Sequence, residues 1–215
     1  MTYSRRHFVL GVGSAILMTS SAGRVLANAQ SKMGKRYVLI HDESRCIGCD
    51  ECSVACNKQN NVPSGYSRLR MVPIPKADNA EEGSEQHYFR HSCQHCDDAP
   101  CITVCPTGAS YRDENGIVQV NRALCLGCDY CVSACPYKVR YINPLNHIAD
   151  KCDFCSESRL SQGYMPICVR VCPKNALTFG PENSEPVQQL LRPDSYYVHQ
   201  LKNTGKPHIY RLISL

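Results

Sequence analysis

The chain has 215 residues, of which 16 are cysteine and none is tryptophan, and its formal net charge is +5. This composition excludes a coiled coil, a collagen, a fully disordered chain and an ordinary cytosolic enzyme with a few buried thiols. No uninterrupted apolar stretch approaches the ~18–20 residues of a membrane-spanning helix, and no run of basic residues favours binding to nucleic acid.

The N-terminal segment has the features of an export signal. Ser4-Arg5-Arg6 precedes a mildly apolar stretch that runs to Met18, and residues 1–27 contain no Asp or Glu. Paired arginines before a short apolar segment are typical of twin-arginine signals, whereas a solvated amphipathic helix is the alternative. We expect cleavage after Ala27 or Ala29, or retention as an uncut anchor. Removing residues 1–27 lowers the net charge from +5 to +2.

Short strands and helices alternate with cysteine-rich loops along the rest of the chain. Apolar and β-branched runs predict strands at 37–41, 87–90, 117–120, 139–142, 177–179 and 209–213. Helices are expected at 52–60 and 185–191. Residues 61–85 are rich in proline and charge, which predicts an exposed excursion. The recurring order of strand, cysteine loop, short helix and strand indicates an α+β protein with an internal repeat.

The sixteen cysteines fall into four groups of four, and none is left over. The groups are Cys46, Cys49, Cys52 and Cys56; Cys93, Cys96, Cys101 and Cys105; Cys125, Cys128, Cys131 and Cys135; and Cys152, Cys155, Cys168 and Cys172. The first and third have the C-x2-C-x2-C-x3-C spacing of bacterial ferredoxins, although Asn57 replaces the proline that follows such a run. Three cysteines of the run wrap one [4Fe–4S] cube, and the fourth serves a different cluster. Sixteen ligands in this pattern predict four cubane clusters.

Three other uses of the cysteines are possible. Exported proteins often contain disulfides, but short repeated spacings would strain many such bridges. Four all-cysteine zinc sites would favour C-x2-C pairs set well apart. The 12-residue gap between Cys155 and Cys168 is the only support for a mixture of clusters and one zinc site. An oxidised cubane with four thiolates carries about −2, so four clusters would take the chain from +2 to about −6.

Several residues beside the ligands suggest a role. Gly48 and Gly127 each stand before a second cysteine, where the backbone approaches inorganic sulfide and unusual φ is needed. His95 lies between two ligands and either donates a hydrogen bond to a cluster or is a solvated loop histidine. Lys151 either offsets cluster charge or contacts a partner, or is an ordinary surface lysine. We find no acid–base pair, nucleophile triad, phosphate loop or haem-attachment motif in the sequence, so we expect no catalytic residue.

The order of the groups predicts two ferredoxin-like modules. The second and third groups are contiguous and form an inner module at 87–143. The first and fourth groups flank it and form an outer module, whose two parts are 28–86 and 144–183. The signal at 1–27 and a C-terminal extension at 184–215, expected to be a packing or docking surface, complete the chain. The fold class is thus α+β, with short strands and helices around four cubane clusters.

The chain resembles the four-cluster ferredoxin-type iron–sulfur subunits of molybdopterin oxidoreductases and their relatives. Within that group it is most similar to the NrfC-type protein of formate-dependent nitrite reduction. The matching stretches are Ser4-Arg5-Arg6 and residues 41–49, 92–96, 105–110, 149–155 and 176–180. The resemblance spans nearly the whole chain, and the cysteine framework is more specific for the four-cluster class than for the nitrite branch.

The resemblance implies how the ligands pair into four sets. Set 1 is Cys46, Cys49, Cys52 and Cys172; set 2 is Cys56, Cys152, Cys155 and Cys168; set 3 is Cys93, Cys96, Cys101 and Cys135; set 4 is Cys105, Cys125, Cys128 and Cys131. Each set would hold one [4Fe–4S] cluster, and we number the clusters 1 to 4 accordingly.

The resemblance also implies an exported electron-transfer subunit. It would relay electrons between an NrfD-like integral membrane protein that oxidises quinol and a periplasmic multihaem cytochrome c nitrite reductase system. It would lie in the periplasm, peripheral to the inner membrane and associated with it through that partner. The alternative is the same relay in a polysulfide, thiosulfate, tetrathionate or dimethyl sulfoxide reductase with a molybdopterin subunit. A zinc-stabilised docking protein is the alternative from a different class.

Overall fold

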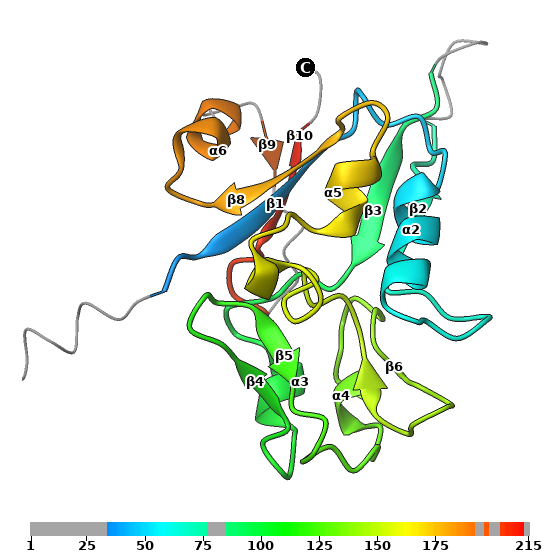
Figure 1. The fold of residues 1–215 in the computed structure, drawn as a ribbon, viewed down its shortest axis with the longest axis vertical. Coiled ribbons are helices and arrows are strands. Elements are labelled where there is room, and N and C mark those ends of the chain that lie inside the picture. Colours follow the sequence, from blue (N-terminus) through cyan, green and yellow to red (C-terminus); the bar gives the residue numbers. More distant parts are fainter. Residues whose placement is uncertain (1–33, 77–84, 192–195, 198–202, 213–215) are drawn as a thin grey trace, which may run out of the picture. The chain divides into compact units, whose positions relative to one another are not determined.

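The computed structural model of the chain describes residues 34–76, 85–191, 196–197 and 203–212 (Figure 1). Its strands are β1 (Tyr37–Asp42), β2 (Leu69–Pro73), β3 (Tyr88–Ser92), β4 (Ser110–Arg112), β5 (Val118–Val120), β6 (Tyr141–Ile142), β7 (Ala149–Asp150), β8 (Leu177–Pro181), β9 (Tyr196–Tyr197) and β10 (Ile209–Leu212). Its helices are α2 (Glu51–Gln59), α3 (Pro100–Thr103), α4 (Tyr130–Ser133), α5 (Ile167–Val171), α6 (Glu185–Leu190) and the 3-10 helix η2 (Leu160–Gln162). These elements confirm the mixture of short helices and strands expected from the sequence.

A four-stranded sheet in the order β8-β1-β10-β9 joins segments from both ends of the described chain. In Figure 1, β1 lies between β8 and β10. Leu39 pairs with Phe179 of antiparallel β8 and with Ile209 of parallel β10. Leu39 packs into the main core, whereas Val38 and Ile40 pack on the opposite side with α6. Because successive side chains of a strand face opposite sides, a strand covered on both faces is apolar throughout.

The C-terminal extension supplies a strand inside this sheet. We expected a terminal strand at 209–213, and the structure shows β10 at Ile209–Leu212, next to β1. Ile209 packs in the main core, and Tyr210 is fully buried on the other side with Val187. Two described parts of the extension, β10 and α6, therefore pack in the fold, as the packing alternative expected.

The prediction that residues 61–85 form an exposed excursion is wrong for the segment around β2, Leu69–Pro73. β2 pairs antiparallel with β3, with Leu69 opposite Ser92, and both Arg68 and Leu69 are buried. Pro73 ends β2, a position that a proline tolerates because it lies at the end of a two-stranded sheet. Charged residues and prolines concealed the strand in the sequence. Residues 77–84 lie outside the described part of the chain.

The cysteines make up much of the interior. Buried cysteines from all four groups belong to the main core cluster, together with Leu69, Ile117 and Phe154. α2 packs against α5, and α3 packs against α4. These contacts bring the first group next to the fourth and the second next to the third. The described residues from Gly34 onward form one compact unit, so the module boundaries at 86, 143 and 183 stay predictions.

One predicted strand and the predicted export signal remain to be compared with the structure. The strand expected at 139–142 is shorter in the structure, where β6 covers only Tyr141–Ile142. The export signal at 1–27 lies outside the described residues. Within those residues, the structure contains no helix with the length and apolar character needed to cross a membrane.

Candidate functional site

The four cysteine groups begin with C-x2-C loops that share one backbone feature. The residue before the second cysteine has a positive φ in every loop: Gly48 (68°), His95 (49°), Gly127 (65°) and Phe154 (54°). A β-carbon at Gly48 would clash with the ring of Tyr88, and one at Gly127 would clash with the carbonyl oxygen of His147. The sequence predicted this conformation for the two glycines. It gave no signal for the histidine or the phenylalanine.

Set 1 is assembled around a pocket. Electrostatic interactions connect Cys46 with Cys49 and Cys172, and Cys52 with Cys46 and Cys172. All four cysteines line one pocket of about 350 Å³, a volume that includes space open to solvent. Burial raises the pKa of the Cys52 thiol to about 12, against a smaller opposing effect of the Arg90 charge.

His41, on β1, forms part of the wall of the same pocket. Its side chain is fully buried, and neither ring nitrogen has a hydrogen-bond partner among the described residues. Burial, followed by the charges of Arg90 and Arg211, lowers the pKa of His41 to about 3. A neutral ring with an unused N–H beside four thiols fits a pocket whose occupant accepts hydrogen bonds. Sequence analysis assigned His41 no role, because it lies near the end of an apolar strand and has no motif of its own.

Set 2 combines Cys56 of the first group with three cysteines of the fourth. Burial raises the pKa of Cys56, and the neighbouring Cys152, Cys168 and Cys155 raise it further. The Asn60 side-chain amide donates to Cys56 Sγ at 3.6 Å and lies 4.0 Å from Cys155 Sγ. A cysteine at the middle of α2 is thus brought to cysteines about a hundred positions later in the chain.

Set 3 joins the second group to the last cysteine of the third. Burial raises the pKa of Cys96 to about 12, with further contributions from Cys93, Cys101 and Cys135. Cys101 lies on α3, and Cys135 follows α4, the helix that packs against α3. The packing of these two short helices brings Cys135 close to the cysteines of the second group.

Set 4 lies next to set 3 and reaches the surface. Burial raises the pKa of Cys131, and the neighbouring Cys101, Cys125 and Cys105 also raise it. Cys101 belongs to set 3, so the two sets adjoin. Cys128, the remaining member of set 4, is exposed, as is Cys49 of set 1. The first and last sets thus each have a cysteine at the protein surface.

Backbone N–H groups donate to several of these sulfur atoms. Ser110 N lies 3.4 Å from Cys105 Sγ, and Ala149 N lies 3.4 Å from Cys125 Sγ. Ala176 N lies 3.2 Å from Cys172 Sγ. Burial by itself would raise the pKa of Cys105, but the hydrogen bonds from Ser110 and Thr107 outweigh it and lower that pKa. Hydrogen bonds to ligand sulfur are one of the means by which proteins tune cluster potentials.

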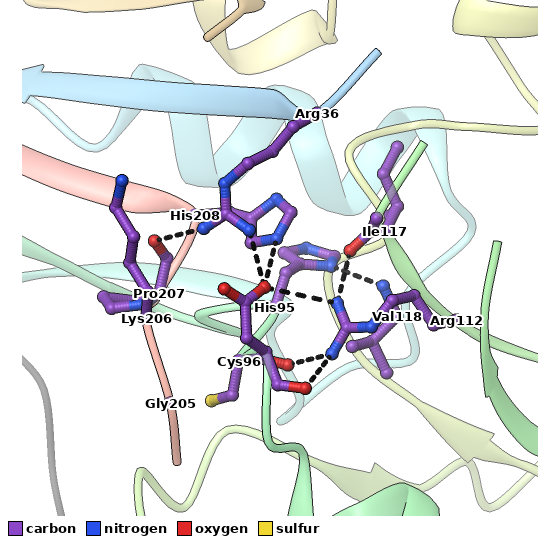
Figure 2. Close-up of polar contacts among 12 residues, drawn as sticks. Arg36, His95, Cys96, Arg112, Ile117, Val118, Gly205, Lys206, Pro207 and His208 are labelled. Atoms are coloured by element: carbon purple, nitrogen blue, oxygen red, sulfur yellow. Dashed lines mark hydrogen bonds and ion pairs between the residues drawn. The ribbon is translucent and has the colours of Figure 1, made fainter. Parts of the chain in front are cut away.

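His95 and Lys151 are both buried, which excludes a solvated loop histidine and an ordinary surface lysine. The Val118 N–H donates to Nδ1 of His95 at 3.1 Å (Figure 2). A neutral ring therefore carries its proton on Nε2, which has no hydrogen-bond partner among the described residues. Burial, followed by the charge of Lys151, lowers the pKa of His95 well below its ordinary value. His95 is thus an unused neutral donor in the interior.

Beside the set 3 loop, the carboxylate of Asp97 contacts three basic side chains, Arg36, Arg112 and His208, all of which are labelled in Figure 2. Its Oδ1 lies 2.5 Å from Arg36, 3.3 Å from His208 and 3.9 Å from Arg112. Burial of Asp97 raises its pKa, but the contacts with Arg36 and His208 outweigh burial and lower it overall. Arg112 also donates to the backbone carbonyl of Cys96. The network connects this ligand loop to the starts of β1 and β10.

All sixteen cysteines are free thiols in the structure. In the described part of the chain, no three Cys, His, Asp or Glu side chains are placed to hold a single metal ion. A structural zinc ion would need four ligands in a tetrahedron, with each sulfur ~2.3 Å from the metal. The thiols of the described residues are therefore not arranged around a single ion.

The sequence matches known proteins along most of its length. A family model for the 4Fe-4S dicluster domain matches residues 84–182. The ferredoxin-like protein YdhX of Escherichia coli K12 is 56% identical over 98% of this chain and 95% of that protein. Protein NrfC of the same organism is 50% identical over 99% of this chain and 96% of its own. The thiosulfate reductase electron transfer subunit PhsB of Salmonella typhi is 51% identical over 82% of this chain and 92% of its own.

Proposed function

The chain belongs to the ferredoxin-like iron–sulfur electron-transfer subunits of oxidoreductases. We propose that it holds four [4Fe–4S] clusters and relays electrons between a quinol-oxidising membrane protein and a periplasmic reductase. The membrane partner is an NrfD-like protein, and the periplasmic partner is a cytochrome c nitrite reductase system. When bound, each cluster accepts and releases one electron. The protein holds the clusters in place and adjusts their potentials.

One observation supports the proposal: cysteines that are distant in sequence interact with one another across the fold. Cys172 lies with Cys46 and Cys52, and Cys56 lies with Cys152 and Cys155. We propose the four ligand sets given above as the sites of clusters 1 to 4. The exchange of the fourth ligand between neighbouring groups is the pattern of two-cluster ferredoxins.

The residues around the thiols fit such a group. The pKa of buried Cys52 is raised to about 12, so without a metal the thiol would keep its proton at neutral pH. Binding of iron removes that proton, because the thiolate is the form that coordinates metal. Within the described residues, one ring N–H of His41, the Nε2–H of His95 and the Nε–H of Arg90 are buried donors without partners, and a cluster sulfur would satisfy them.

The cofactor proposal is tested by metal and sulfide analysis of anaerobically purified full-length protein. Four cubanes require about 16 iron and about 16 acid-labile sulfide per chain, and reduction should produce electron paramagnetic resonance (EPR) signals of reduced cubanes. Stoichiometric zinc without sulfide would contradict the proposal and support the zinc-stabilised docking protein instead.

In a second candidate function the chain is the same electron relay, but it serves a different reductase. The identity to PhsB, 51%, is as high as the identity to NrfC, 50%, although it covers less of this chain. The chain would then serve a reductase of thiosulfate, polysulfide, tetrathionate or dimethyl sulfoxide, with a molybdopterin subunit as partner. Purification of the intact complex from membranes distinguishes the two. Multihaem cytochrome in the complex supports nitrite reduction, and stoichiometric molybdenum supports the second candidate.

We also propose that the chain is exported by the twin-arginine route and is bound to the inner membrane through its partner. This rests on Arg5, Arg6 and the absence of acidic residues from 1–27. Replacing both arginines by lysine should abolish delivery to the periplasm when the chain is produced without its partners, since a partner could otherwise carry it across. Unchanged delivery of that variant would contradict the route.

A further inference from the structure

Three cationic residues are buried among the cysteine sets. Arg90 is 3% exposed, Lys151 is 2% exposed and Arg140 is 5% exposed. Buried arginines elsewhere use other partners: Arg159 donates to the backbone carbonyl of Met165 and lies over the ring of Tyr164. Arg68 lies 2.8 Å from Asp150 and 3.3 Å from Asp153. Within the described residues, neither Arg90, Lys151 nor Arg140 forms an ion pair with a carboxylate.

Arg90, on β3, lies between sets 1 and 2. Its Nη2 donates to Cys152 Sγ of set 2 at 3.5 Å, and its charge also acts on Cys56 of that set. The same charge acts on Cys52 of set 1. Nη1 donates to the Ser92 hydroxyl, while Nε has no partner in the described part of the chain. The guanidinium is thus placed to face both sets.

Arg140 has the equivalent position between sets 3 and 4. Its Nη2 donates to Ser110 Oγ at 2.9 Å, which fixes the side chain. Its charge acts on Cys101 and Cys93 of set 3 and on Cys131 of set 4. Nε has no hydrogen-bond partner within the described ranges.

Lys151 occupies the remaining junction, between sets 2 and 3. Its Nζ donates to the carbonyl oxygen of Cys152 at 2.9 Å and to that of Val118. Its charge acts on Cys93 of set 3. Each neighbouring pair of sets therefore has one buried cation between its members.

A buried charge without an opposite charge is strongly disfavoured in a folded protein. Carbonyl and hydroxyl oxygens satisfy some N–H groups of these residues, but they supply no net negative charge. Disulfides in place of the clusters would leave the three cations uncompensated. A cubane with four thiolates supplies about −2 at each set and removes that difficulty.

We propose that Arg90, Lys151 and Arg140 are the built-in counter-charges of the four clusters, one at each junction, and that they raise the reduction potentials of the clusters on both sides. This inference rests on the proposed function. Reduction adds one negative charge to a cluster, and a fixed cation in a poorly screened interior stabilises the reduced form. The same cation weakens the repulsion between two reduced neighbours, so that an electron on one cluster does not hinder arrival of an electron on the next.

The experiment is a potentiometric titration followed by EPR, on full-length protein purified anaerobically. Arg140→Gln removes one charge and should lower the potentials of two of the four redox steps, those of clusters 3 and 4. Arg90→Gln should lower the other two. We expect a change of about tenfold in each affected reduction equilibrium, which is ~59 mV for one electron.

Two kinds of control separate charge from packing. Arg140→Lys and Arg90→Lys retain the charge and should keep the wild-type potentials. Arg122→Gln makes the same charge change at an exposed position, where solvent screens it, and should move no step. If the lysine variants shift the potentials as far as the glutamine variants do, charge is not the cause and the inference is overturned.

Iron and sulfide contents distinguish the failure of this inference from that of the proposed function. Wild-type protein without clusters overturns the proposed function. Wild-type and glutamine variants with equal iron, equal sulfide and equal potentials overturn only the inference. If a glutamine variant cannot hold its clusters but the lysine variant can, the charge requirement is supported. Loss of clusters from both variants assigns the residue to packing and overturns its role as a counter-charge.

Discussion

The imidazole ring of His95 stacks on the phenyl ring of Phe154, with 4.0 Å between the ring centroids and 29° between the planes. Both residues stand before the second cysteine of a C-x2-C loop and have positive φ, where Gly48 and Gly127 stand in the other two loops. A left-handed residue with a side chain costs roughly 1–2 kcal/mol, which a glycine would avoid. The stack fills the space between the loops of sets 2 and 3 and so offsets that cost.

Removing the phenyl ring should destabilise the protein strongly. Phe154 is fully buried, so Phe154→Ala leaves a cavity and should cost about 3–5 kcal/mol of unfolding free energy. For a chain of this size we expect the midpoint of thermal unfolding to fall by about 6–20 °C. Phe154→Leu, which retains most of the volume, is the matched control. An alanine variant no less stable than the leucine variant would show that the ring fills no essential space.

Gly48 and Gly127 should not tolerate a side chain, because a β-carbon at either position would clash with a neighbouring residue. A glycine that has positive φ but open space around it should tolerate one. Gly48→Ala places a β-carbon against the ring of Tyr88, and we expect loss of cluster 1, measured as about four fewer iron atoms per chain. Gly65 also has positive φ, 83°, but a β-carbon there would meet no atom within 4 Å. Gly65→Ala should therefore keep full iron content and lose only roughly 1–2 kcal/mol of stability. Equal iron in both variants would refute the close approach at Gly48.

The C-terminal strand should be required for stability. Ile209 is buried opposite Leu39 in the central pair of strands, so Ile209→Ala should destabilise the protein by ~2–5 kcal/mol. Ile209→Val, which removes one methylene, should cost only ~0.5–1.5 kcal/mol. Thermal unfolding of the two variants beside wild type measures both values. If Ile209→Ala lowers the unfolding free energy by less than ~0.5 kcal/mol, the smallest loss expected for Ile209→Val, then β10 does not contribute to the core as described.

Acid should destabilise the fold at His208, the residue before β10, because protonation places a charge on a buried ring near Arg36. Burial, followed by the charge of Arg36, lowers the pKa of His208 below 6.5 in the folded state. The unfolded chain therefore binds more protons just below pH 6.5, and this contribution to stability is complete above 6.5 and lost as the pH falls. Relative to His208→Gln, wild type should lose at most about 1.4 kcal/mol per pH unit in this window. Thermal unfolding at several values between pH 8 and 5.5 tests this, and a pH-independent difference would contradict it.

Cysteine spacing and apolar runs made much of the structure predictable. β1, α2, β8 and α6 lie close to the positions expected, because each combines a clear apolar or cysteine pattern with local propensity. β2 was missed because buried Arg68 and the proline at its end resemble loop composition. The pairing of Arg68 with Asp150 and Asp153 is a long-range contact that no local pattern indicates.

The surroundings of the ligands were less predictable than the ligands themselves. Arg90 and Arg140 lie in or next to short strands, where a charged residue normally indicates a solvent-facing position. Their burial follows from the negative charge expected at the cysteine sets, which propensity scales do not include. His95 and Phe154 adopt a backbone conformation typical of glycine, and the contact that stabilises them joins two loops far apart in the sequence.

The central claim is that the four cysteine sets each hold one cubane. X-ray diffraction from a crystal of the anaerobically purified protein, measured at the iron absorption edge, would locate the iron directly. We expect four separate peaks of anomalous scattering, each bounded by one set, with Cys172 at the first and Cys56 at the second. Thiols joined in disulfides, or a scattering signal at the zinc edge with none at the iron edge, would contradict the account.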